Sequence, residues 1–167
     1  VWHGRDLADW ATTVPGVRGV ELPREFTATP LGAVAGAASV QVPLALLTPA
    51  QAATVEACAT GSVVITPSRG LVLLGAARRL PELAAVGLVD NPASPWSAIS
   101  ACVGAPSCVS SMINTRAYAT TLAQSGPPLP RTHISGCERR CGAPTGDHQD
   151  LVAPDVLDLL TLAGEVR

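Results

Sequence analysis

Four cysteines carry the most specific chemical signal in this chain of 167 residues. They form two pairs, spaced C-x5-C and C-x3-C, with 28 residues between the pairs. Each pair can present two thiolates from a short stretch of backbone, so together they supply the four soft sulfur ligands of a metal centre. The four are Cys102, Cys108, Cys137 and Cys141.

The spacing favours a [4Fe-4S] cluster over a zinc ion. Structural zinc sites prefer C-x2-4-C knuckles around an ion about 2.3 Å from each sulfur, and the first pair is spaced more widely. The irons of a cluster occupy different corners, so its ligands can come from a wider loop. Disulfides rank third, because they belong to short secreted domains, and this sequence shows no signal peptide. We predict a [4Fe-4S] cluster on all four cysteines, and a small buried, unreactive Cys58.

The composition excludes several classes of partner. An apolar content of 47% is enough for a packed core, but no apolar run reaches the ~18 residues that a membrane helix needs. A formal net charge of −2 offers no overall attraction to nucleic acid. Free thiols and the absence of a targeting segment predict a cytoplasmic protein with neither membrane nor nucleic acid as partner.

All 11 basic residues are arginines, and four of them lie between the first and last of the paired cysteines. Arginine suits bidentate recognition of carboxylates, although codon bias would also give a chain without lysine. Arg139 and Arg140 lie inside the second cysteine pair, where positive charge would offset the thiolates and raise a cluster's reduction potential.

The first half of the chain predicts a connector followed by an α+β unit. Prolines and glycines interrupt residues 1–34, which we interpret as a connector. In residues 35–92 the pattern predicts a strand from Ala38, a helix from a capping box at Thr48 to about Ala59, a hairpin and a short helix. The hairpin strands are 63–66 and 71–74 with a four-residue loop, and the last helix runs from Pro81 to Gly87.

The second half, residues 93–167, carries the cysteines. We predict a loop from the first cysteine to the second, a helix over 109–123, ended by 126–128, and a strand over 132–135. Val109, Met112, Ile113 and Ala117 are expected to form the buried face of that helix. In the last segment the apolar pattern fits either a helix after Pro154 or a hairpin of 151–153 with 156–160.

The segments ACVGAPSC, Thr115-Arg116 and HISGCERRC together resemble the cluster-binding signature of the sulfite and nitrite reductase hemoproteins. With TPSRGLVLLG upstream, residues 31–145 look most like the precorrin-3B synthases of that superfamily. The resemblance implies an α+β fold: a ferredoxin-like half-repeat followed by an α/β iron–sulfur cluster-binding domain of the sulfite reductase type. The family often has Lys-Gly or Asn-Gly where this chain has Arg139 and Arg140.

The resemblance also implies an oxidoreductase that handles a tetrapyrrole. In the reductases the thiolate matching Cys141 bridges the cluster to siroheme iron. In precorrin-3B synthases the tetrapyrrole is the substrate: a monooxygenase of aerobic cobalamin biosynthesis converts precorrin-3A to precorrin-3B with dioxygen. The expected cofactors are the [4Fe-4S] cluster with either siroheme or a mononuclear iron, and the expected partners are an electron donor and the second half-repeat that this chain lacks.

Two arginines are candidates for contacts with the carboxylates of such a ring. They are Arg69, at the hairpin tip, and Arg116, after the first cysteine pair. The alternative for each is a solvated surface arginine or an ion pair worth ~0–1 kcal/mol. His133, on a predicted strand, is interpreted as a packed, hydrogen-bonded residue rather than a ligand. Alternative functions are a siroheme-dependent sulfite or nitrite reductase fragment and a non-catalytic zinc or electron-carrier module.

Overall fold

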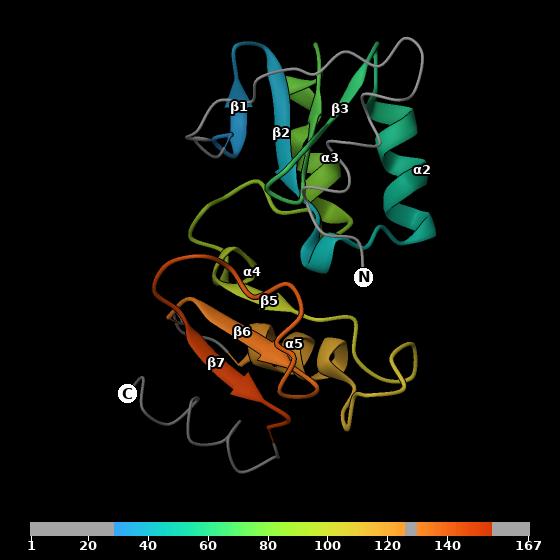
Figure 1. Ribbon diagram of the computed structural model, residues 1–167. Coiled ribbons are helices and arrows are strands. Elements are labelled where there is room, and N and C mark those ends of the chain that lie inside the picture. The colour runs from blue at the N-terminus through green and yellow to red at the C-terminus, as the bar shows by residue number, and fades with distance from the viewer. Residues whose placement is uncertain (1–28, 126–129, 155–167) are drawn as a thin grey trace, which may run out of the picture.

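The computed structural model describes residues 29–125 and 130–154, which form two β-sheets with helices packed on them (Figure 1). The first sheet is antiparallel, in the order β1-β2-β4-β3, and the second is parallel, in the order β5-β6-β7. No helix in these two ranges combines the length and the apolar character needed to cross a membrane. The strands are β1 (Gly32–Val34), β2 (Ala37–Gln41), β3 (Val63–Thr66), β4 (Gly70–Leu73), β5 (Ile99–Ala101), β6 (Thr132–Ser135) and β7 (Gln149–Val152); the α-helices are α2 (Pro49–Cys58), α3 (Leu80–Ala85), α4 (Pro95–Ala98) and α5 (Thr115–Gln124).

The first sheet confirms the predicted strand, hairpin and two helices. Helix α2 begins at the expected capping box: Thr48 Oγ1 accepts from the Gln51 amide at 3.2 Å, and Gln51 Oε1 accepts from the Thr48 amide at 2.9 Å. Cys58, at the end of this helix, is buried among apolar side chains as predicted. The hairpin loop is one residue shorter than expected, because Gly70 already pairs with Thr66. Strand β1, which pairs with β2, was not anticipated within the connector.

The second sheet consists of three parallel strands in the order β5-β6-β7 and is covered by α5. Its core joins Ile99 of β5, Ile134 of β6, and Ala119 and Leu122 of α5. Strand β6 matches the prediction residue for residue. Strand β7 contains Leu151 and Val152, which belong to the first arm of the predicted hairpin alternative. Residues 155–167 lie outside the described residues, as does the predicted helix end at 126–128.

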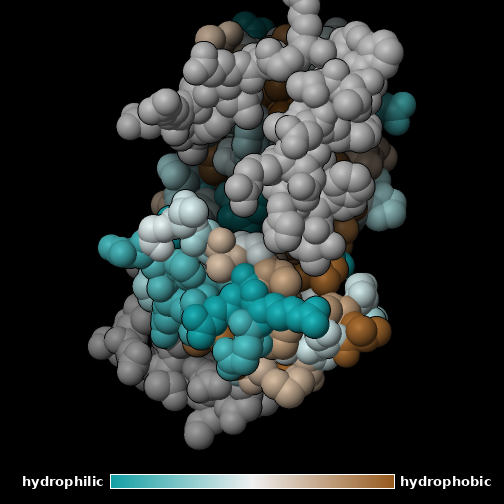
Figure 2. All heavy atoms as spheres, in the orientation of Figure 1, coloured by the Kyte–Doolittle hydropathy of each residue, from teal (hydrophilic) through white to brown (hydrophobic). Residues whose placement is uncertain are grey.

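The prediction that a helix begins at Val109 was wrong. Helix α5 begins at Thr115, Val109 is fully exposed, and Met112 is 75% exposed. Short polar side chains explain the difference, since they bond nearby backbone groups and favour turns and caps. Ser111 Oγ donates to the Ile113 carbonyl at 2.7 Å, and Asn114 Oδ1 accepts from the Ala117 amide at 3.0 Å. Apolar side chains therefore remain on the surface at this loop, where Figure 2 shows brown spheres at the rim of the second sheet.

Side chains join the two sheets directly. Gln41, almost fully buried at the end of β2, uses its amide on both sides: Nε2 donates to the Trp96 carbonyl at 3.4 Å, and Oε1 accepts from Ser97 Oγ at 3.3 Å. Arg69, in the β3–β4 hairpin, donates from Nη1 to the Ile99 carbonyl at 3.0 Å. The hairpin of the first sheet is thereby fixed against the first strand of the second.

Candidate functional site

The two cysteine pairs leave neighbouring parallel strands at the same end. Cys102 directly follows β5, and Cys137 lies two residues after β6. Because β5 and β6 run parallel, their carboxyl ends meet at one edge of the sheet, which is the usual place for a site in such sheets. A backbone bond of 2.9 Å from the Cys102 amide to the Ile134 carbonyl continues the pairing into the first cysteine loop.

Direct contacts hold the two cysteine loops together. The amide of Gly136, next to Cys137, donates to the sulfur of Cys102 at 3.3 Å. In return, the amide of Met112 donates to the Gly136 carbonyl at 3.0 Å. Backbone amides that donate to cysteine sulfur are among the features that tune iron–sulfur clusters. The first sulfur of one pair is thus bonded to the loop of the other.

Two glycines permit this close approach. A Cβ atom on Gly136 would overlap the side chain of Ser111 and lie 3.2 Å from its Cα. A Cβ atom on Gly104 would overlap the Thr115 side chain, and the backbone of Gly104 has a φ of +66°, which side chains other than glycine rarely adopt. A larger residue at position 136 would force the two cysteine loops apart, and one at position 104 would push the first loop away from the start of α5.

The cysteines of the C-x5-C and C-x3-C motifs are all free thiols and form no disulfides. Cys141 is exposed, and the other three are partly buried. Within residues 29–125 and 130–154, no three histidine, cysteine or acidic side chains gather as one metal ion would require. Cluster thiolates bind separate iron corners and so do not need that convergence. Four free soft thiols on two hydrogen-bonded loops fit a [4Fe-4S] group as a donor set, and ligation by these cysteines stays a prediction.

The second cysteine pair encloses a tight turn, closed by a 3.2 Å bond from the Arg140 amide to the Cys137 carbonyl. Arg140 has a φ of +47°, a left-handed conformation that favours glycine. This is the region where the resembled family often has glycine. The Arg140 guanidinium lies 3.5 Å from Asp150 and 3.7 Å from Glu138, and both contacts are at the surface.

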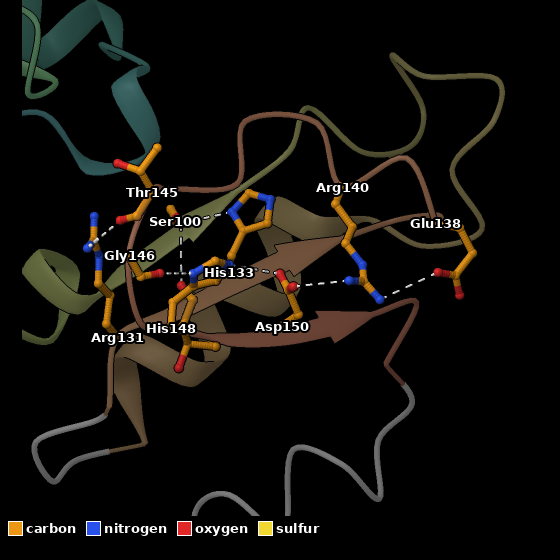
Figure 3. A network of polar contacts seen from close by, with 10 residues as sticks. Ser100, Arg131, His133, Glu138, Arg140, Thr145, Gly146, His148 and Asp150 are labelled. Atoms are coloured by element: carbon orange, nitrogen blue, oxygen red, sulfur yellow. Dashed lines mark hydrogen bonds and ion pairs between the residues drawn. The ribbon is translucent and has the colours of Figure 1, made fainter.

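A polar network extends from this turn to the strands beside it (Figure 3). His133 is fully buried on β6, and its Nδ1 and the Ser100 hydroxyl are 2.9 Å apart, so the prediction of a packed, hydrogen-bonded histidine is confirmed. Burial, the largest effect, lowers the pKa of His133, and Asp150 partly opposes this. His148 contacts Asp150 at 3.2 Å and meets the His133 ring edge-on, at 6.4 Å between centroids. The β6–β7 register, which pairs His133 with Asp150, creates this network. No spacing in the sequence predicted it.

The two candidate arginines occupy different places. Arg69 lines two cavities of about 510 and 450 Å³ at the junction of the sheets. Burial and the nearby charge of Arg131 lower the pKa of Arg69. Arg116 lies in the first turn of α5 and lines neither cavity. Sequence reasoning missed Arg131, which lines both cavities; its only signal was the local excess of basic residues.

No family model matches this chain, and no curated protein matches it at a significant level. Solved structures with local similarity include the NirA protein of Mycobacterium tuberculosis, with 24% identity over 60% of this chain and a TM-score of 0.46. Dissimilatory sulfite reductase I (DsrI) aligns with 63% of the chain at 17% identity and a TM-score of 0.44. The chain spans 22% and 29% of the lengths of these two proteins.

Proposed function

We propose that this chain is the cluster-bearing segment of an oxidoreductase that acts on a tetrapyrrole, of the type that converts precorrin-3A to precorrin-3B in aerobic cobalamin biosynthesis. The observation that carries the proposal is the bond between the Gly136 amide and the Cys102 sulfur, which joins the two cysteine loops. The TPSRG hairpin, the first cysteine loop and the HISGCERRC segment supply the sequence resemblance.

Each part of the chain has a role in this proposal. The four paired cysteines would hold the [4Fe-4S] cluster, which transfers electrons one at a time. The Gly136 amide would orient one ligand sulfur and stabilise its negative charge. Arg140, in the turn of the second pair, would add positive charge beside the thiolates.

The arginines would hold the carboxylates of the ring. Arg69 suits this role better than Arg116, because Arg69 lines both cavities at the junction and Arg116 lines neither; the 450 Å³ cavity also includes Gly142, which directly follows Cys141. A ring carboxylate at Arg69 would therefore lie on the cluster side of the junction. The second half-repeat and the electron donor would come from outside the described residues.

A siroheme-dependent sulfite or nitrite reductase is the second candidate. The observation that favours it is the exposure of Cys141, since a sulfur shared with a haem iron must be accessible beyond its own loop. The two candidates differ in the bound group: a reductase would be purified with siroheme, and a monooxygenase with the cluster and no haem.

Anaerobic purification followed by iron, sulfide and zinc analysis tests the cluster. We expect about four irons and four sulfides per chain. Replacement of any of the four paired cysteines by serine should remove most of this iron, whereas the matched control Cys58→Ser should retain it. Stoichiometric zinc without sulfide would replace the proposal with a structural metal module. The absorption spectrum of the same sample separates the two oxidoreductases, because siroheme is coloured independently of the cluster.

A further inference from the structure

We propose that ordered water binds between strand β6 and the turn of the second cysteine pair, where it joins His133 Nε2 to the Ser135 hydroxyl and to the backbone of Cys141. The ligand of this site is neutral water and not an ion. The inference deepens the proposed function, on which it rests only for the role of Cys141 as a cluster ligand. The groups that would bind the water belong to the chain whether or not a cluster is present.

His133 and Ser135 lie on the same face of β6, because side chains two residues apart in a strand point to the same side. Ile134, between them, points to the opposite side and packs against α5. The exposed fractions of His133 and Ser135 are 0% and 1%. Two polar side chains are therefore enclosed on the face of the strand away from α5, directly before the second cysteine pair.

Each of these two side chains has a polar atom without a partner. His133 Nε2 and Ser135 Oγ are buried and form no hydrogen bond with any residue in 29–125 or 130–154. Buried polar groups in folded proteins are nearly always paired, and ordered water supplies the partner where the protein does not. A water molecule held by such groups replaces most of the hydrogen-bond energy that burial removes.

The hydrogen bonds of Ser100 determine which ring nitrogen of His133 carries the proton. The single hydroxyl proton of Ser100 is donated to the Thr132 carbonyl at 3.4 Å. Ser100 Oγ therefore accepts from His133 Nδ1, 2.9 Å away (Figure 3). Burial lowers the pKa of His133 and so favours the neutral ring. In a neutral ring with the proton on Nδ1, Nε2 is an acceptor that needs a donor.

Water fits these groups better than a metal ion does. It can donate one proton to Nε2 while it accepts from the Ser135 hydroxyl, and its second proton remains for a carbonyl. Burial dominates the pKa of His133, but the Cys141 backbone lies close enough to raise it without a direct bond to Nε2. A metal ion would need more ligands, and no three histidine, cysteine or acidic side chains converge in the described parts of the chain. The water would thus tie β6 to the turn that carries Cys141.

Two measurements on the full chain test the site directly. A high-resolution crystal structure should show ordered water bonded to His133 Nε2 and to Ser135 Oγ. Nitrogen-15 NMR of the histidine rings at neutral pH should show His133 with its proton on Nδ1, its signals being assigned by their loss in His133→Asn. A dry site, a metal ion identified by anomalous scattering, or a proton on Nε2 would overturn the inference.

Ser135→Ala tests the link between the water and the cysteine turn. The amides of Arg140 and Ala143 bond to carbonyls within this turn, so their hydrogen exchange reports its local opening. We expect about two- to tenfold faster exchange of both amides in Ser135→Ala, the range that corresponds to the loss of one hydrogen bond. The matched control is Ser62→Ala, because Ser62 is exposed; it should exchange as wild type does.

The outcome is independent of the cluster analysis. Equal exchange of the Arg140 and Ala143 amides in Ser135→Ala and Ser62→Ala would show that the water does not hold the turn, and would overturn the proposed link. A negative iron and sulfide analysis would refute the cluster and leave the water site standing. A dry site in a chain that binds four irons would refute the water alone.

Discussion

The close approach of the two cysteine loops can be tested by adding one methyl group. In Gly136→Ala the new Cβ would overlap the Ser111 side chain, at 2.6 Å from its Cβ, and lie 3.2 Å from its Cα. The first contact is far shorter than normal packing, and the second involves backbone. One loop must therefore move, and the bond between the Gly136 amide and the Cys102 sulfur should lengthen or break.

The cost follows from two opposing effects. Overpacking a fitted contact destabilises by about 1–3 kcal/mol. Replacing glycine with alanine at a compatible backbone conformation stabilises by about 0.4–1 kcal/mol, and Gly136 does not have a positive φ. We expect a net loss of about 1–2 kcal/mol in the free energy of unfolding, together with reduced iron retention. Gly61→Ala is the control, because nothing lies within 4 Å of its Cβ position; it should be neutral or stabilising.

Denaturant unfolding and iron analysis of purified protein measure both effects. Ser111→Gly in the Gly136→Ala background removes the overlapping side chain and should restore part of the loss, with a coupling energy of about 0.5–3 kcal/mol. If Gly136→Ala unfolds with the same free energy as Gly61→Ala and keeps all its iron, the loops do not meet as described. The reasoning from their contact would then be wrong.

Three further predictions concern single side chains. Arg140→Gly should leave the stability unchanged or raise it, because relief of the positive φ gains about 1 kcal/mol and offsets the loss of two surface contacts worth about 0–1 kcal/mol. Arg139→Gly, the control, should lower the stability, and comparison of the thermal midpoints of the two variants tests this prediction. Burial lowers the pKa of His133, so the unfolded chain takes up a proton at a higher pH than the folded chain does. The free energy of unfolding should therefore fall as the pH drops below about 6.5, by at most ~1.4 kcal/mol per pH unit. Chemical denaturation at several pH values should show a smaller slope for His133→Asn. Thr48→Ala should cost about 1 kcal/mol by removing the capping box, as urea unfolding would show; an unchanged midpoint would contradict its role.

Local signals predicted most of the first sheet. The capping box at Thr48, the apolar alternation of β2 and the two runs of the hairpin each determine their own element, and the structure agrees within one residue. The wrong prediction that a helix begins at Val109 also came from a local pattern. An apolar spacing suggested a helix, but Ser111 and Asn114 bond the backbone first and delay α5 until Thr115.

The site was predictable in its residue types but not in its arrangement. Cysteine spacing pointed to four ligands, and the structure puts the two loops at one sheet edge, yet the amide bond from Gly136 depends on parallel pairing that no local pattern encodes. The role of Arg131 and the pairing of His133 with Asp150 were missed for the same reason, because their neighbours are distant in sequence. Arg131 shares its cavities with Arg69 of the first sheet, and the β6–β7 register places His133 beside Asp150.

The parallel pairing of β5 with β6 also sets the order in which the proposed cluster could be assembled. Parallel neighbours cannot be joined by a tight turn, and here the crossover passes through α5. Contacts of this kind form late during folding, because the intervening chain must first lose its freedom. A nascent chain therefore displays two independent dithiol segments, and inorganic iron and sulfide added before the crossover has docked would meet each segment separately. Reconstitution in vitro should accordingly proceed faster on refolded protein than during refolding.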